Sequence, residues 1–329
     1  MKTDAVSNLR GAASLFFYAL NTLIWVTPIF TMALLKMAIP FRPFRKFCDR
    51  ILNRCAENWI GCNNLNQDVF THTAFRVSGA ESLDRRSWYL VVSNHQSWVD
   101  ILVLQRIFHR RIPFLKFFLK KELFWFPVMG QAWWALDFPF MKRYSSRFLE
   151  QHPHLRGRDL AVTRKACEKF KTIPVSVMNF LEGTRFTPAK HHRQGSPYRH
   201  LLRPRAGGIA FVIGAMGDCL KSLIDVTIAY PEGAPSFWDF LCGRIREVRV
   251  QVRSLPLSPE MLGDYFNEAA FRDSFQNWVN ALWEQKDRCV EALLAGAPEP
   301  GAEAACPALP PFYERSEEHT SELQSPNTI

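Results

Sequence analysis

The residues with the clearest chemical potential are His95 and Asp100, which lie in the run NHQSWVD at residues 94–100. An imidazole removes a proton from a hydroxyl group efficiently when a carboxylate binds its other ring nitrogen and stabilises the cation that forms. The spacing therefore predicts that His95 is a general base and that Asp100 orients it. A solvated loop pair without a catalytic role is the competing interpretation, because one histidine and one aspartate at this spacing are common by chance.

A second group of polar residues, Glu182-Gly183-Thr184-Arg185, follows an apolar run at residues 175–180. The guanidinium of Arg185 offers a planar fork of donors that suits a phosphate group. Gly183 lets the backbone approach an anion closely, because it has no side chain. These residues are therefore predicted to bind the anionic part of a substrate.

Both groups of residues follow segments that are typical of buried strands. Residues 87–93 form a short run of β-branched, aromatic and aliphatic side chains directly before the first group. Ser97 is placed to cap a helix that opens at Trp98. Loops that follow strands are where α/β proteins usually build their sites, so we expect His95 and Arg185 to face a crevice.

Two further segments complete an ordered set of four. Residues 136–143, LDFPFMKR, end in Lys142 and Arg143, and residues 226–231, VTIAYP, form an apolar strand-like run. The four segments together resemble the glycerolphosphate acyltransferase superfamily, and specifically the 1-acylglycerol-3-phosphate (lysophosphatidate) acyltransferases. Among these the chain is most similar to the YihG-type inner-membrane acyltransferase of gammaproteobacteria. Leu181 stands where the family usually has proline, and Tyr230 stands where it usually has an aliphatic residue.

The resemblance implies transfer of a fatty acyl group from an acyl thioester to the sn-2 hydroxyl of lysophosphatidate or a related lysophospholipid, in phospholipid synthesis or remodelling. His95 would be the base, and Arg185 with Lys142 or Arg143 would hold the acceptor phosphate. Glu182 would orient Arg185 or bind a glycerol oxygen, and Thr184 would cap or orient the loop. The acyl donor, acyl-CoA or acyl carrier protein, would be a co-substrate, and no cofactor is expected.

A catalytically silent membrane protein that keeps the same fold to bind lipid or a partner is the alternative from another functional class. The complete set of reacting residues favours the enzyme.

The N-terminal segment is suited to a membrane. Residues 11–35 contain no charged side chain, and as a helix they would extend about 37 Å, enough to cross a bilayer core of about 30 Å. Basic residues crowd the C-terminal flank of this run, which places the following domain in the cytoplasm by the positive-inside rule. We therefore expect residues 1–65 to anchor the chain to the bacterial inner membrane. Asn21 and Pro28 interrupt the run, so a spanning helix and a helical hairpin confined to one leaflet both remain open.

A net charge of +10 and an isoelectric point near 9.3 favour anionic partners. Membrane lipid, phosphate-bearing substrates and an acidic carrier protein all qualify. Nucleic acid is not an expected partner, because no recognition module accompanies the basic loop at residues 190–205. The eight cysteines and the histidines lack the spacing of metal ligands, so no metal site is predicted.

Residues 66–296 are predicted to form one α/β domain with a mixed sheet. The expected strands are 72–78, 87–93, 136–141, 174–181, 223–230 and 246–253, and the expected helices lie near 98–109, 119–134, 157–172, 206–215 and 268–294. Residues 114–134 are rich in Phe, Leu and Trp, which suits either a core or a groove for acyl chains. Residues 297–329 are predicted to be a disordered tail, within which residues 315–325 resemble a translated sequencing adapter.

Overall fold

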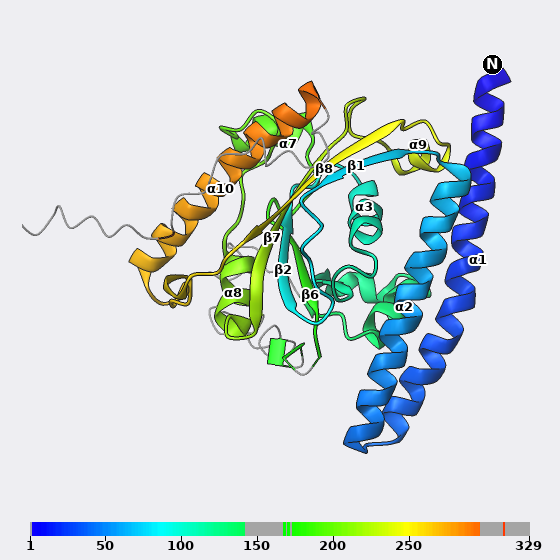
Figure 1. Cartoon of the computed structure of the whole chain (residues 1–329), viewed down its shortest axis with the longest axis horizontal. Coiled ribbons are helices and arrows are strands. Elements are labelled where there is room, and N and C mark those ends of the chain that lie inside the picture. Colours follow the sequence, from blue (N-terminus) through cyan, green and yellow to red (C-terminus); the bar gives the residue numbers. More distant parts are fainter. Residues whose placement is uncertain (1, 142–166, 169, 172, 297–311, 313–329) are drawn as a thin grey trace, which may run out of the picture.

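The computed structural model of the chain describes residues 2–141, 167–168, 170–171, 173–296 and 312. Its centre is a six-stranded sheet with the order β1-β8-β7-β2-β6-β3, covered by helices on both faces (Figure 1). The strands are β1 (Ala74–Ser78), β2 (Trp88–Ser93), β3 (Leu115–Phe117), β6 (Ser176–Phe180), β7 (Leu220–Ala229) and β8 (Glu247–Leu255).

The sheet is mixed, as predicted. β7 and β8 are antiparallel, whereas β2 is parallel to both of its neighbours, β6 and β7. Ser93 at the end of β2 is in register with Phe180 of β6 and with Val226 of β7. Because parallel strands end at the same edge of a sheet, the loops that follow β2, β6 and β7 converge there.

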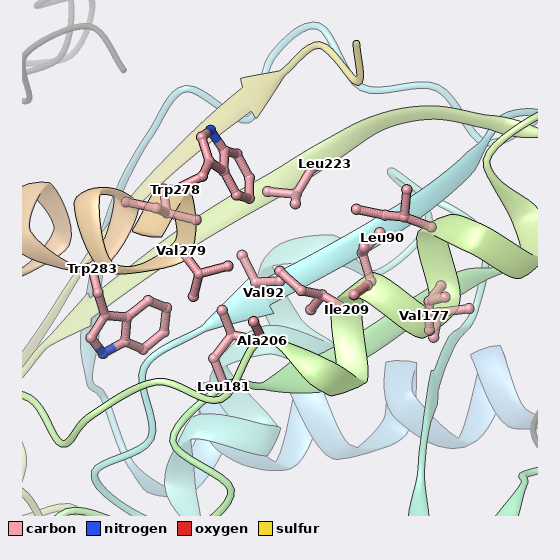
Figure 2. Close-up of a cluster of buried hydrophobic side chains, with 14 of the residues drawn as sticks. Leu90, Val92, Val177, Leu181, Ala206, Ile209, Leu223, Trp278, Val279 and Trp283 are labelled. Atoms are coloured by element: carbon pink, nitrogen blue, oxygen red, sulfur yellow. The ribbon is translucent and has the colours of Figure 1, made fainter. Parts of the chain in front are cut away.

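The two faces of the sheet carry different helices. Helix α3 (Val99–Phe108) and the hairpin of α1 (Lys2–Ala38) and α2 (Arg42–Phe70) lie on one side, and α8 (Gly207–Met216) and α10 (Ala269–Ala295) cover the other (Figure 1). Figure 2 shows the core of the second face, where Trp278, Val279 and Trp283 of α10 meet aliphatic side chains of the sheet. Trp283 is completely buried, which fixes α10 firmly against the strands.

Helices α1 and α2 run side by side as an antiparallel hairpin (Figure 1). Polar contacts join them at three levels: the hydroxyl of Ser14 donates to Asn66, Asn21 donates to Asn63, and Lys36 pairs with Asp49 at 2.5 Å. Within α1, the stretch Asp4–Ala38 is long and apolar enough to cross a membrane. Helix α2 continues to Phe70, so the domain boundary predicted at residue 65 falls inside a helix.

The main differences from the predicted elements lie between residues 114 and 141. Only Phe140–Met141 of the predicted strand 136–141 is extended; it forms β5, which pairs with β4 (Leu119–Lys120) in a separate two-stranded sheet. The predicted helix 119–134 is divided into a 3-10 helix, η1 (Lys121–Trp125), and α4 (Met129–Ala135). Pro127 and the left-handed backbone of Val128, with φ of 66°, break the helix between them.

The other helices and strands are confirmed predictions, elements that were not predicted, or predicted segments outside the described residues. The helices predicted near 98–109, 206–215 and 268–294 are confirmed as α3, α8 and α10. The short helices α7 (Pro188–Gln194), α9 (Phe237–Leu241) and η3 (Pro259–Met261) were not predicted, and neither was the three-residue strand β3. Lys142, Arg143, most of the predicted helix 157–172 and nearly all of the predicted tail lie outside the described residues.

Candidate active site

Three loops at one edge of the sheet form the candidate site. His95 follows β2, Glu182 follows β6, and Tyr230 follows β7 directly. Asn94 joins the loop after β2 to the end of β7, because its side-chain amide donates to the carbonyl of Ile228 at 2.9 Å and accepts from the Ile228 N–H at 2.9 Å. The strand ends therefore bring together the first, third and fourth of the sequence segments.

The predicted pair of His95 and Asp100 is formed. Nδ1 of His95 lies 2.8 Å from Oδ2 of Asp100, and the two side chains are 11% and 0% exposed. Because an ionised carboxylate only accepts hydrogen bonds, Nδ1 carries the proton and Nε2 keeps its lone pair. Nε2 is thus the ring atom that can accept a proton from a substrate hydroxyl.

Asp100 is held by three other donors. The backbone N–H groups of Gln96 and Ser97 donate to Oδ2 at 2.6 and 2.8 Å, and the hydroxyl of Tyr230 donates to Oδ1 at 2.6 Å. Burial, followed by the adjacent Asp100 charge, raises the pKa of Tyr230 well above its usual value, so the phenol stays a donor. Ser97 also assists the start of α3, because its hydroxyl oxygen accepts from the Val99 N–H at 3.1 Å.

His95 is fixed from its other sides as well. Its ring stacks on Phe180, with ring centroids 3.9 Å apart and planes inclined by 13°. Its backbone N–H donates to Oε1 of Glu182 at 3.0 Å, and its carbonyl accepts from the Phe186 N–H at 2.7 Å. The loop after β6 therefore sets both the orientation of the ring and the position of the backbone.

Glu182 is placed differently from the sequence expectation. It is only 1% exposed, and its second oxygen, Oε2, accepts from the Leu202 N–H at 3.1 Å. Burial raises the pKa of Glu182 to about 8, against the opposing effect of these two backbone donors. The Glu182 carboxyl group therefore joins the loop after β2 to the segment around Leu202. Among the described residues, it forms no hydrogen bond with Arg185.

Arg185 lies at the exposed side of the site. Its guanidinium carbon is 4.6 Å from the centre of the Trp98 ring, and within the described chain the guanidinium group forms no hydrogen bond or ion pair. Trp98 is itself 52% exposed. A guanidinium that stacks on an indole and keeps its donors free is suited to a phosphate.

Lys190, which was not predicted to be a site residue, adds a second cation. Its ammonium donates to the Thr184 hydroxyl at 2.7 Å and to the Arg185 carbonyl at 2.9 Å. Thr187 caps α7 by accepting from the Lys190 N–H, which explains why Lys190 returns to the loop. Gly183 has φ of 66°, a conformation that favours glycine, and so allows the tight turn before Thr184.

A further layer of support comes from α10. The indole N–H of Trp283 donates to the Leu202 carbonyl at 3.0 Å, so α10 is linked to Glu182 through one residue. One turn later, the fully buried Lys286 donates to the Val226 carbonyl at 2.6 Å and pairs with the equally buried Asp225. In the sequence these residues look like an ordinary amphipathic stripe, and only their partners identify them.

Comparisons with known proteins relate the chain to acyltransferases. The acyltransferase family model matches residues 74–231, which contain all three loops. A human 1-acyl-sn-glycerol-3-phosphate acyltransferase delta is 26% identical over 209 residues, covering 60% of this chain and 51% of the human protein. An uncharacterised acyltransferase of Schizosaccharomyces pombe is 23% identical over 232 residues, covering 64% of this chain and 61% of its own. The chain thus spans about half to three fifths of the curated relatives it matches.

Residues 74–231, just under half of the chain, therefore match the acyltransferase family. Its fold is similar to that of the 1-acyl-sn-glycerophosphate (LPA) acyltransferase PlsC from Thermotoga maritima, with a TM-score of 0.50 and 17% identity, covering 89% of this chain and all of that one. The matched residues 74–231 include His95, Asp100, Glu182, Gly183, Thr184 and Arg185, which lie in the loops at one edge of the sheet.

Proposed function

We propose that this acyltransferase moves a fatty acyl group from an acyl thioester to the sn-2 hydroxyl of lysophosphatidate or a related lysophospholipid. The observation that carries the proposal is the 2.8 Å contact between Nδ1 of His95 and Oδ2 of Asp100, which leaves Nε2 as a base beside an exposed arginine. The similarity to lysophosphatidate acyltransferases supports the choice of acceptor.

The reaction balances without a covalent enzyme intermediate. Nε2 of His95 takes the proton from the acceptor hydroxyl as its oxygen attacks the thioester carbonyl carbon. The carbon–sulfur bond then breaks, and the imidazolium returns the proton to the departing thiolate. Asp100 stabilises the imidazolium in between, and the buried donors around Asp100 hold that carboxylate ready.

The acceptor phosphate is proposed to bind to Arg185 and Lys190. Arg185 lies on the loop that also fixes His95, through the bond between Phe186 N–H and the His95 carbonyl, and Lys190 reaches this loop from α7. Binding the phosphate there would hold the hydroxyl near Nε2, a positioning effect that can lower a barrier by several kcal/mol. Lys142 or Arg143 remains part of the proposal as a further phosphate ligand. Glu182 and Thr184 are proposed to shape this loop.

The α1–α2 hairpin is proposed to lie in one leaflet of the membrane. Helix α2 packs along α1 and carries Arg50, Arg54 and Glu57, so an α1 that crossed the bilayer would draw these charges toward the hydrocarbon. The exposed aromatics Trp125 and Phe126 on the segment after β4 would reach the same surface. We propose a bacterial inner membrane and a cytoplasmic catalytic domain, as the basic flank of residues 11–35 indicates.

Two narrower assignments remain proposals. The YihG type is proposed from a resemblance that extends over nearly the whole chain, and the donor is either acyl-CoA or acyl carrier protein. A silent binder on the same fold is the second function, and the free Nε2 of His95 argues against it.

The test uses the full-length chain, purified in detergent, with labelled acyl-CoA or labelled acyl carrier protein. Each donor is supplied with lysophosphatidate, with lysophosphatidylethanolamine, or with a monoacylglycerol that lacks phosphate. We expect label in phosphatidate with at least one donor, and little label in diacylglycerol. Transfer to no acceptor from either donor, by protein that still binds lysophosphatidate, would favour the silent binder.

A further inference from the structure

A second cationic site lies far from His95. Arg50 and Arg54 of α2, Arg85 of the loop before β2, and Arg110 of the turn after α3 line one hollow of about 440 Å³ that is open to solvent, together with Asn53 and Glu57. Four guanidinium groups meet there against one carboxylate. The hollow therefore carries a net positive charge, which attracts an anion.

Two of the four arginines are held in place by neighbouring side chains. Nη2 of Arg85 contacts both carboxylate oxygens of Glu57 at 2.9 Å, and Nη2 of Arg110 donates to the Asn58 side-chain oxygen at 3.0 Å. Arg50 and Arg54 make no hydrogen bond or ion pair within the described chain. The hollow therefore combines two oriented guanidinium groups with two whose donors are all available, as phosphate binding requires.

The backbone at Arg110 adds an independent observation. Its φ is 59°, in the left-handed region, just beyond the end of α3. Glycine is the usual residue at such a position, and a larger residue costs about 1 kcal/mol there. Glycine at this position would therefore remove the guanidinium without straining the backbone, which makes Arg110 suitable for a test of the hollow.

The hollow is distinct from the proposed catalytic site. Arg85 precedes β2 and His95 follows it, so the six-residue strand separates them by about 20 Å. The hollow instead faces out from α2, one of the two helices proposed to lie on the membrane. A phosphate group at the bilayer surface could reach it while the catalytic site is occupied.

We propose that this arginine hollow binds a phosphate group, carried by an anionic phospholipid or present as the free anion. The lipid would hold the hairpin and the catalytic domain in a fixed relation, since Arg50 and Arg54 belong to the hairpin and Arg85 and Arg110 to the domain. The hollow would bind the phosphate group whether or not acyl transfer takes place.

The test measures binding to the full-length chain in neutral detergent with three probes: dioctanoylphosphatidylglycerol, dioctanoylphosphatidylcholine and inorganic phosphate. The variants are Arg54→Gln and Arg110→Gly, and the matched control is Arg86→Gln, which removes an exposed charge from the same loop as Arg85 but outside the hollow. We expect phosphatidylglycerol to bind at least about tenfold more tightly than phosphatidylcholine. Each hollow variant should weaken it about tenfold, the value of one charge-assisted hydrogen bond.

The Arg110→Gly variant separates lost binding from lost folding. Because glycine relieves the left-handed backbone, this variant should unfold at the same temperature as the wild type or higher without ligand, yet lose the anion response. Inorganic phosphate binding as tightly as the lipid would identify the free anion as the ligand, and weaker binding would identify the lipid. Equal binding of both lipids, hollow variants that behave like Arg86→Gln, or binding that only Arg185→Gln weakens would each overturn the proposal.

Discussion

The hydroxyl of Tyr230 donates a 2.6 Å hydrogen bond to Oδ1 of Asp100, on the side of the carboxylate away from His95. Both residues are buried, so no solvent can replace this donor if it is lost. The relationship joins the loop after β7 to the proposed base through a single carboxylate.

Tyr230→Phe should therefore change the pH dependence of catalysis. Without the phenol, Asp100 has one donor fewer and attracts a proton to the His95–Asp100 pair more strongly. The rising limb of kcat/KM against pH is expected to move to higher pH, and kcat near neutrality to fall about tenfold. Tyr265→Phe, on a phenol away from the site, is the control. If the rising limb of kcat/KM lies at the same pH in Tyr230→Phe as in the wild type, the phenol does not influence the base.

Glu182 should make stability fall as the pH rises. Its pKa is raised from 4.5 in the unfolded chain to about 8 in the fold, mainly by burial. Between these two pKa values, the folded state keeps the Glu182 proton that the unfolded chain has lost. The favourable contribution of Glu182 to the free energy of unfolding is therefore complete below about pH 4.5 and is lost as the pH rises through about 8. Urea unfolding from pH 5 to 9 should show this decline in wild type relative to Glu182→Gln. A difference in unfolding free energy that stays flat or grows with pH would contradict the assignment.

Trp283→Phe should lower kcat although Trp283 is remote from substrate. The change leaves the Leu202 carbonyl without its donor, at a cost of about 1–3 kcal/mol, and loosens the residue that holds Glu182. We expect kcat to fall severalfold while KM for the acceptor stays the same. Trp278→Phe is the matched control, since Trp278 lies on the same helix and packs in the same core. Equal effects of the two changes would indicate a packing role alone.

Arg185→Lys should weaken recognition of the acceptor phosphate. Lysine keeps the charge but loses the planar fork and the stacking on Trp98. KM for lysophosphatidate is expected to rise about tenfold, with a much smaller change for monoacylglycerol. Arg193→Lys, an exposed arginine on α7, should leave both values unchanged. A parallel rise for both acceptors would argue against a phosphate contact.

The sequence predicted the parts of the site that depend on short, ordered segments. His95, Asp100 and the loop at residues 182–185 were all found because the strands before them are apolar and regular. The support from Trp283, Lys286 and Lys190 was missed, because contacts between residues far apart in the chain leave no local pattern.

The fold was predicted least well between residues 114 and 141. An aromatic-rich run there suggested one helix, but Pro127 and the turn at Val128 divide it, and a three-residue strand such as β3 has no detectable alternation. The burial of Glu182 was also not predicted from the sequence. Its burial follows from the fold of the 198–205 segment over it, which the motif itself does not specify.

The most direct test of general-base catalysis by His95 measures acyl transfer from a labelled thioester to lysophosphatidate by wild type, His95→Ala and His192→Ala. His192 is an exposed histidine on α7 and controls for the loss of an imidazole. We expect labelled phosphatidate with wild type and His192→Ala, and a loss of at least about a hundredfold with a His95→Ala protein that retains the wild-type unfolding temperature. Equal label from a folded His95→Ala protein would contradict general-base catalysis by His95.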